Sequence, residues 1–144
     1  MSCIIDLFVA SAKNKFRGNY YLLFDYMAYD LTGLVDKKVK FNLPQIKYIM
    51  KSLLKGLDYL HSEVNLAHRD IKGANILMSA EGKVQITDFG LARILNLKNQ
   101  KATYTTRVVT LWYRAPELLL GFKNYNFSVD IWSMGCVFVE LITG

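Results

Sequence analysis

Apolar residues recur most regularly in the second quarter of the chain. Seven of them are spaced three or four residues apart: Ile46, Ile49, Met50, Leu53, Leu54, Leu57 and Leu60. This spacing puts them on one face of a helix. Asn42 can cap that helix, and Pro44 falls in its first turn, where a missing N–H is harmless. Gly56 inside the helix costs about 1 kcal/mol relative to alanine, which predicts a close packing contact there.

The residues before this helix favour strands. Two β-rich apolar runs, Cys3–Ala10 and Tyr20–Met27, are separated by the polar and basic stretch Ser11–Asn19. Such an arrangement is typical of a hairpin with a long connection. A short helix is expected around Leu31–Asp36.

The second half of the chain has a more varied pattern. Two short strands are predicted at Ile76–Met78 and Val84–Thr87, on either side of the turn signal at residues 81–82. Asp88–Glu117 lacks periodicity over most of its length, and a loop of that length is usually functional or disordered. Ser128–Gly144 is apolar nearly all round, which predicts a helix buried on all sides.

Composition indicates one packed domain. The chain has 144 residues, of which 52% are hydrophobic. Its formal net charge is +6, but the basic residues are scattered, so we expect solvated faces and not a nucleic-acid surface. Two cysteines cannot form a disulfide framework, and Cys136 is expected to be a buried free thiol. The apolar run Ile131–Ile142 is too short to span a bilayer, so no membrane segment is expected.

Two short strings carry candidate chemistry. Residues 68–75 are His-Arg-Asp-Ile-Lys-Gly-Ala-Asn, and residues 88–90 are Asp-Phe-Gly after a predicted strand. Asp70, Asn75 and Asp88 supply side-chain oxygens from these neighbouring segments, and Mg²⁺ prefers oxygen ligands that it shares with phosphates. Phosphoryl transfer needs positioning and charge neutralisation more than covalent chemistry from the protein. These side chains therefore suit a magnesium ion that is shared with phosphates.

With Ala-Pro-Glu at residues 115–117 behind them, the strings resemble the motifs of the protein kinase family. A lone Asp-Phe-Gly would be weak, whereas three strings in this order are specific, and chance carboxylates in solvated loops are the disfavoured alternative. The resemblance implies a partial protein-kinase-like fold of the α+β class. Residues 1–27 would be the end of the small lobe and the start of the hinge, and residues 28–144 part of the large lobe. ATP and Mg²⁺ are the implied cofactors.

The resemblance also implies roles for single residues. Asp70 is the expected catalytic base for the substrate hydroxyl, and Asn75 and Asp88 are the expected metal ligands. Lys72 would approach the γ-phosphate, and a lysine at this place marks serine/threonine kinases. Thr110 matches a threonine that bonds both the base and this lysine.

Two histidines are expected to be structural. By resemblance, the ring of His68 packs against Phe89 and supports the turn, although a general base is the alternative role. His61 ends the long helix without a partner in the sequence, so a surface position or C-terminal capping is expected.

The stretch before the first helix resembles the fifth strand and hinge of kinases. By this resemblance, Phe24 is the gatekeeper, and the backbones of Asp25 and Met27 hydrogen-bond adenine. Asp30 is the implied ribose contact, and Leu77 is the implied apolar floor of the purine. Residue chemistry alone leaves a simple core strand as the alternative here, because apolar strand residues carry no chemical signature.

Residues 110–117 resemble the group that contains cyclin-dependent and MAP kinases. In that group, a valine at the place of Val109 takes an unusual backbone conformation, and the arginine at Arg114 satisfies its carbonyl. No hydrogen bond is then offered to the residue after the phosphoacceptor, so proline, which lacks an N–H, is accepted. The implied substrate is a protein with a Ser/Thr-Pro site.

Residues 104–110 and 118–121 resemble cyclin-dependent kinases, and residues 29–34 and 88–93 resemble their transcriptional branch. That branch includes the catalytic subunit of the positive elongation factor, which phosphorylates the C-terminal repeat of RNA polymerase II. A cyclin partner and a nuclear location are implied, with the cytoplasm as the alternative. Thr105 is the expected activating phosphorylation site, within reach of Arg69 and Arg93, while Thr103 and Thr106 are competing acceptors.

The chain departs from the family pattern at its start. A kinase needs a Gly-rich loop, a lysine on the third strand and a glutamate on the αC helix, and the sequence shows none of them. Lys13, Lys15 and Lys38 lack a Val-Ala-Ile-Lys context, and Gly18 stands alone. We therefore expect a partial kinase domain whose cyclin contact involves the missing αC region. Two functions follow: part of an active kinase, or a catalytically inert interaction module.

Overall fold

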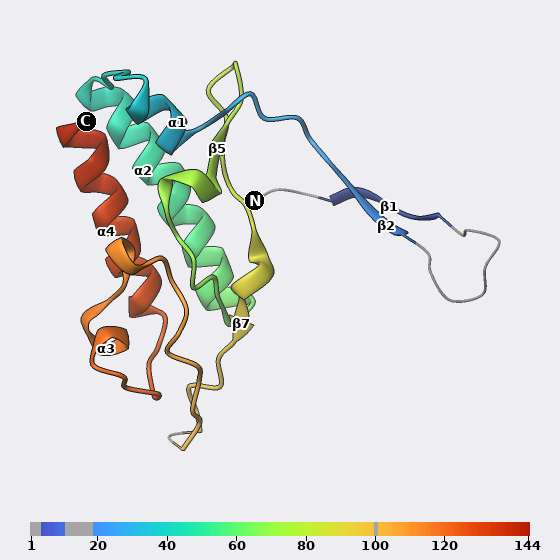
Figure 1. The fold of residues 1–144 in the computed structure, drawn as a ribbon, viewed down its shortest axis with the longest axis vertical. Coiled ribbons are helices and arrows are strands. Elements are labelled where there is room, and N and C mark those ends of the chain that lie inside the picture. Colours follow the sequence, from blue (N-terminus) through green and yellow to red (C-terminus); the bar gives the residue numbers. More distant parts are fainter. Residues whose placement is uncertain (1–3, 11–18, 100) are drawn as a thin grey trace.

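The computed structural model describes residues 4–10, 19–99 and 101–144. Most of the predicted loop Ser11–Asn19, including Lys13, Lys15 and Gly18, lies outside these residues. Two long helices, α2 (Leu43–Asp58) and α4 (Ser128–Thr143), run side by side in Figure 1. The catalytic strings and the following loop lie along this pair.

The predicted hairpin is confirmed. Strand β1 (Ile4–Ala10) pairs antiparallel with β2 (Asn19–Phe24), with Ile4 opposite Phe24. The second apolar run was predicted to reach Met27, but β2 ends three residues earlier, at Phe24. The two strands form a sheet of their own.

Two small antiparallel sheets frame the predicted site. Strand β5 (Ile76–Met78) lies between β3 (Tyr29–Asp30) and β6 (Val84–Ile86). Strand β4 (Leu66–Ala67) pairs with β7 (Arg93–Ile94). The first sheet contains both strands predicted around residues 81–82, where Gly82 has a φ of 87° that favours glycine.

The predicted Asn42 cap of α2 is confirmed, and α1 has a side-chain cap that was not predicted. Helix α1 (Leu31–Asp36) begins after Asp30, whose Oδ1 accepts from the Gly33 N–H at 2.8 Å. Before α2, Asn42 Oδ1 accepts from the Gln45 N–H at 3.0 Å, and Gln45 Oε1 accepts from the Asn42 N–H at 2.9 Å. These reciprocal bonds form a capping box. A π-helical turn, Tyr59–Glu63, extends α2.

The core forms along the predicted face of α2. Its buried members on this helix and the following turn are Ile46, Ile49, Leu53, Leu57 and Leu60. Leu54 was placed on the same face, but it is 43% exposed. Spacing alone could not show that Leu54 is exposed, because the apolar face of α2 is wider than the surface that the other described elements cover.

Helix α4 is buried on one face only, so the prediction of burial on all sides is wrong. Val129, Met134 and Val137 are buried, whereas Ile131 and Trp132 are about half exposed, at 48% and 50%. Helix α2 and the turn Leu111–Tyr113 pack against α4, whereas the second face is only bordered by Pro116 and Glu117 of α3. Cys136, predicted to be buried, is half-buried, and burial raises the pKa of its thiol.

The long segment Asp88–Glu117 is more structured than its sequence indicates. It contains the 3₁₀ turns Phe89–Leu91 and Leu111–Tyr113, strand β7 and the start of α3 (Pro116–Leu119). Elements of two to four residues are too short to produce a readable period. No helix among the described residues has both the length and the apolar character needed to cross a membrane.

The Gly56→Ala variant is expected to be more stable, by up to about 1 kcal/mol, because alanine is the better helix former. A Cβ built at Gly56 would lie 3.6 Å from Ile86 Cδ1, an ordinary van der Waals distance, so the close contact predicted from the sequence is absent. Urea unfolding of the two chains measures the change. A loss of stability would mean that the α2–β6 contact is tighter than in this structure.

Candidate active site

Asp130 in the first turn of α4 positions residues 68–75, the candidate catalytic loop. Its side chain is fully buried, with Oδ2 accepting from the His68 N–H and Oδ1 from the Arg69 N–H, each at 2.8 Å. The location near a helix N-terminus also favours a carboxylate. Sequence reasoning missed this residue, although a lone acidic residue at the start of an apolar helix was an available signal.

The expected surface or capping role of His61 is wrong. Its Nε2 lies 2.8 Å from Asp130 Oδ2, and its ring stacks on Phe127 with centroids 4.7 Å apart. The side chain is only 11% exposed. His61 therefore supports the same carboxylate that holds the catalytic loop, through a contact that spans 69 residues of sequence.

His68 is structural, as predicted. Its ring packs edge-on against Phe89 with centroids 4.9 Å apart. Nε2 is 2.9 Å from the Thr87 carbonyl, and Nδ1 is 3.3 Å from the Asp70 nitrogen. Burial lowers the pKa of His68, so the neutral ring donates from Nε2 and accepts at Nδ1.

The carboxylate of Asp70 is the centre of a polar cluster. Lys72 Nζ lies 2.8 Å from Oδ2, and Asn75 Nδ2 donates to the same oxygen at 3.0 Å. Thr110 Oγ1 donates to Oδ1 at 3.1 Å and accepts from Lys72 Nζ at 3.1 Å. Burial alone would raise the pKa of Asp70, but Lys72 and Thr110 outweigh it and lower the pKa. The group is thus ionised at neutral pH.

Asp88 reaches the same region from the end of β6. The Thr87 N–H donates to the Asn75 carbonyl at 3.0 Å, which joins the two predicted metal-binding segments. Asp88 has a φ of 60°, is exposed, and accepts from the Gly90 N–H at 3.1 Å. No cluster of three or more His, Cys, Asp or Glu side chains among the described residues is placed to hold a metal. One carboxylate and one amide fit Mg²⁺, which takes its other ligands from phosphates and water.

The predicted nucleotide-binding residues are only partly brought together. Asp30 pairs with Leu77 across β3 and β5, and Leu77 is half-buried. Asp30 also caps α1, because its Oδ1 accepts from the Gly33 N–H. Phe24 and Asp25 are exposed before this sheet, and the Asp25 carboxylate lies 3.6 Å from Lys83 Nζ. Met27 is half-buried in the same connection.

Val109 has the left-handed backbone conformation implied by the resemblance, with a φ of 65°. Its carbonyl accepts from Arg114 Nη2 at 2.8 Å and from Nε at 3.3 Å. Arg114 Nε also donates to the Val108 carbonyl at 3.0 Å. A β-branched residue with positive φ is strained, and such strain is found mainly at functional sites.

Arg69 and Thr105 are linked through Tyr125, a residue that sequence reasoning missed. Arg69 Nη1 donates to the Tyr125 hydroxyl at 3.0 Å, and that hydroxyl donates to the Thr105 carbonyl at 2.8 Å. Arg69 Nε donates to the Leu91 carbonyl at 2.7 Å. Thr105 is exposed, as is Arg93 in β7. A phosphate on Thr105 would therefore form next to a segment already tied to Arg69.

Tyr113 and Glu140 form another unpredicted link, between the loop and α4. The Tyr113 hydroxyl donates to Glu140 Oε1 at 2.6 Å. Burial and the neighbouring carboxylate raise the pKa of Tyr113, while a backbone hydrogen bond from Gly73 opposes the shift. The buried phenol thus connects the end of the loop with the catalytic loop and with α4.

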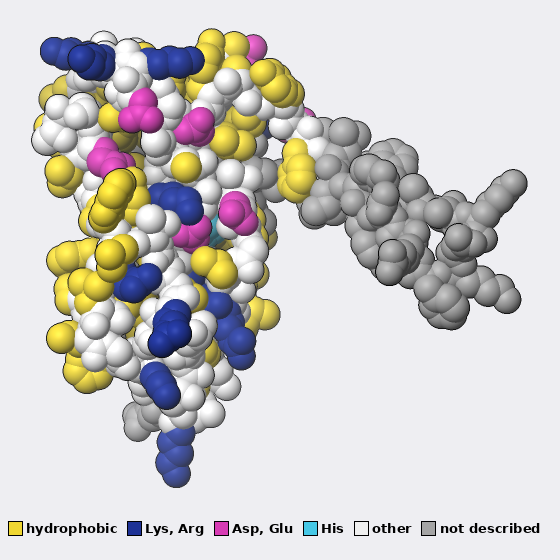
Figure 2. Space-filling model, viewed as in Figure 1, with side chains coloured by type: hydrophobic (Ala, Val, Ile, Leu, Met, Phe, Trp, Pro, Cys, Tyr) yellow, Lys and Arg dark blue, Asp and Glu magenta, His cyan; other side chains and the backbone are white. Residues whose placement is uncertain are grey.

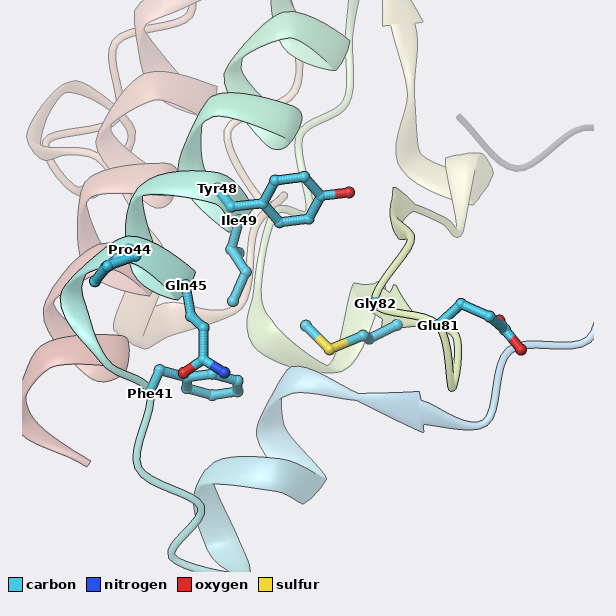
Figure 3. A pocket seen from close by; sticks show the side chains of 8 residues that line it. Phe41, Pro44, Gln45, Tyr48, Ile49, Glu81 and Gly82 are labelled. Carbon is cyan, nitrogen blue, oxygen red and sulfur yellow. The ribbon is translucent and has the colours of Figure 1, made fainter.

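A separate cavity of about 440 Å³ lies away from this cluster. In Figure 3, Tyr48 and Ile49 of α2 form one wall, and Glu81 and Gly82 of the β5–β6 turn form the other. Phe41 lies at the end nearest the start of α2. The cavity shares no lining residue with the Asp70 cluster, so it is not the proposed reaction site.

Comparison with known families agrees with this geometry. The family model described as "Protein kinase domain" matches residues 2–144. The chain belongs to this family. A solved structure, the yeast RNA polymerase II CTD kinase CTDK-1 complex, superposes on this kinase chain with a TM-score of 0.85 and 48% identity. That match covers 97% of this chain and 43% of the other, and it confirms the predicted kinase-like fold.

Cyclin-dependent kinases are among the most similar curated proteins, as the motifs predicted. Cyclin-dependent kinase C-1 of Oryza sativa subsp. japonica is 51% identical over 132 residues, which cover 91% of this chain and 25% of that protein. Human cyclin-dependent kinase 9 is 47% identical over 137 residues, 93% of this chain and 37% of that protein. The kinase chain thus spans a quarter to about a third of these relatives. The lobe boundary at residue 27 stays a prediction.

Proposed function

We propose that this chain supplies the catalytic loop, metal ligands and substrate-binding loop of an ATP-dependent serine/threonine kinase of the cyclin-dependent type. The observation that carries the proposal is the cluster in which Lys72, Asn75 and Thr110 all bond the Asp70 carboxylate. These contacts fix both oxygens of a single ionised base. A chance carboxylate on a loop would not be held from three directions.

In the proposed reaction, Asp70 orients the substrate hydroxyl and accepts its proton. Its lowered pKa keeps it in the acceptor form, and Asn75 and Thr110 fix its orientation. Lys72 neutralises the carboxylate and is proposed to meet the transferred phosphate. Asn75 and Asp88 would hold Mg²⁺, which supplies charge neutralisation to the phosphates of ATP.

The nucleotide would lie on the β3–β5 side of the cluster. Leu77 is proposed to form the apolar floor under the purine, and Asp30 Oδ2 is proposed to meet the ribose. Phe24 is proposed as the gatekeeper, with the backbones of Asp25 and Met27 at adenine. Supporting this placement, Asp30 and Leu77 face one another in the sheet that leads directly to Asn75.

We propose that the substrate carries Ser-Pro or Thr-Pro. Both Arg114 bonds to the Val109 carbonyl remove that oxygen from the substrate's reach. A residue with an N–H after the phosphoacceptor would then lose its partner, whereas proline loses nothing. The test is phosphorylation of two peptides that differ only in having proline or alanine directly after the phosphoacceptor. Equal kcat/KM for the two peptides would contradict the proposal.

A cyclin partner, a substrate in the transcription apparatus and a nuclear location are proposed from the relatives. Several of these are named cyclin-dependent kinases, and the superposed yeast complex is named an RNA polymerase II CTD kinase. The direct experiment is a chimera in which this chain replaces the matching segment of the rice kinase. Failure to phosphorylate a C-terminal-repeat peptide with cyclin present would overturn the substrate proposal.

Thr105→Ala in this chimera is expected to lower activity about tenfold or more, because a phosphate there would add about −1.5 to −2 charge beside Arg69 and Arg93. Thr105 is exposed to a modifying kinase and its carbonyl is tied to Arg69 through Tyr125. Activity of cyclin-bound chimeras is compared with Thr103→Ala as the control. Equal activity of Thr105→Ala and the unmodified chimera would exclude the role.

A further inference from the structure

The segment around Thr105 carries unbalanced positive charge. Between Asp88 and Glu117, the chain has five basic residues and no Asp or Glu: Arg93, Lys98, Lys101, Arg107 and Arg114. Figure 2 shows Lys and Arg side chains over the lower half of this face, with the visible Asp and Glu side chains above them. Charges of one sign repel each other and oppose a compact arrangement. Without a phosphate, this segment is therefore held in place by contacts that are not ionic.

Tyr125 supplies such a contact. Its side chain is buried, at 4% exposed, and its hydroxyl lies between two segments. This hydroxyl accepts from Arg69 Nη1 at 3.0 Å and donates to the Thr105 carbonyl at 2.8 Å. In the part of the chain that the structure describes, no direct hydrogen bond joins residues 104–107 to residues 68–75. The hydroxyl of Tyr125 is thus the bridge between them.

The ring of Tyr125 is held independently of its hydroxyl. The rings of Tyr104 and Tyr125 are 5.5 Å apart and tilted by 54°. The Tyr104 N–H also donates to the carbonyl of Lys123, two residues before Tyr125, at 2.8 Å. Aromatic pairs at this distance stabilise their packing without help from polar groups. Replacing Tyr125 by phenylalanine should therefore remove the bridge and leave the ring in place.

Arg69 connects this bridge to the proposed base. It directly precedes Asp70, is buried, and has a φ of 65°, a strained conformation for a residue other than glycine. Its Nε donates to the Leu91 carbonyl at 2.7 Å. A guanidinium has five N–H donors, so the bonds to Leu91 and Tyr125 leave donors for a phosphate. Arg69 can therefore bind a phosphate on Thr105 and keep its bond to Tyr125.

We propose that Tyr125 is a positioning residue that holds the Thr105 segment against Arg69 before Thr105 is phosphorylated. The inference rests on the proposed function for the roles of Thr105 and Asp70. A phosphate would add charge-assisted bonds from Arg69 and Arg93, which are stronger than the neutral bond and perform the same task. Tyr125 thereby sets the activity of the unphosphorylated kinase, and with it the factor by which phosphorylation activates.

The test is Tyr125→Phe in the cyclin-bound chimera, assayed after phosphorylation of Thr105 and again after phosphatase treatment. The kcat/KM of the unphosphorylated form should fall about tenfold, the usual effect of losing one hydrogen bond to a charged group. The phosphorylated form should lose less than about threefold, because the phosphate replaces the bridge. Tyr104→Phe is the matched control. It removes a hydroxyl that accepts from the Asn96 N–H and not from Arg69, so both forms should change equally.

An equal fractional loss in the two forms of Tyr125→Phe would overturn the proposal, since Tyr125 would then only support the fold. No loss in either form would overturn it as well.

Trypsin cleavage after Arg107 in the 144-residue chain is a second readout, because Arg107 is exposed two residues beyond Thr105. Cleavage follows local opening, so it should be at least about threefold faster in Tyr125→Phe than in the parent or Tyr104→Phe. Equal rates in the three chains would contradict the bridge. This cleavage does not require kinase activity, so failure of this inference is distinguishable from failure of the proposed function.

Discussion

Asp70→Asn is expected to lower kcat of the chimera by about 100-fold or more, the usual contribution of general acid–base catalysis. The amide cannot accept the hydroxyl proton. It also presents NH₂ to one side of a cluster in which Lys72 and Asn75 donate to one oxygen and Thr110 donates to the other. Either amide orientation therefore places donors against donors. Steady-state phosphorylation of a Ser-Pro peptide measures the loss.

ATP affinity distinguishes this role from a general loss of structure. Asp70 is proposed to face the hydroxyl and not the purine, so the variant should bind ATP nearly as well as the parent. Asp36→Asn, at an exposed position at the end of α1, is the matched control and should keep full activity. If Asp70→Asn retains more than about a tenth of kcat, Asp70 is not the base.

Local patterns predicted the parts of the structure that depend on neighbours in sequence. The three-and-four spacing and the Asn42 cap predicted α2, and the string at residues 68–75 placed Asp70, Lys72 and Asn75 close together, although the contacts of Lys72 and Asn75 with Asp70 were not predicted. Thr110 is different, because its contact with Asp70 spans 40 residues. Only the family resemblance placed it at the base.

Long-range polar contacts could not be predicted in this way. Asp130 meets His61 across 69 residues and His68 across 62, and neither partner belongs to a recognisable string with it. The link from Arg69 to Thr105 through Tyr125 is of the same kind. A single sequence gives the chemistry of each residue but not its distant partner.

Burial around α4 was mispredicted for a different reason. An apolar pattern on all sides shows that a helix can be covered everywhere, but it does not show which elements cover it. In this structure, Met134 and Val137 are buried, while Ile131, Trp132 and Val139 are about half exposed beside Pro116 and Glu117 of α3. Hydropathy therefore predicted the inner face correctly and the outer face wrongly.

Asp130→Ala is expected to cost about 2–6 kcal/mol of stability, because two buried N–H groups lose their acceptor and each costs about 1–3 kcal/mol when left unpaired. The groups are the backbone amides of His68 and Arg69, and His61 loses its partner as well. Since a folded domain has only about 5–15 kcal/mol in total, the variant should be close to unfolding. Urea denaturation of the 144-residue chain, followed by tryptophan fluorescence, measures the change.

Two variants separate the hydrogen bonds from the loss of a charge. Asp130→Asn retains one acceptor oxygen, so its free energy of unfolding should lie between that of the parent and that of Asp130→Ala. Asp36→Ala removes an exposed carboxylate and should change stability by no more than about 0.5 kcal/mol. A loss below about 1 kcal/mol for Asp130→Ala would mean that the two amides find water or another acceptor in solution. The catalytic loop would then be held by the packing of His68 and Ile71, and not by the carboxylate of α4.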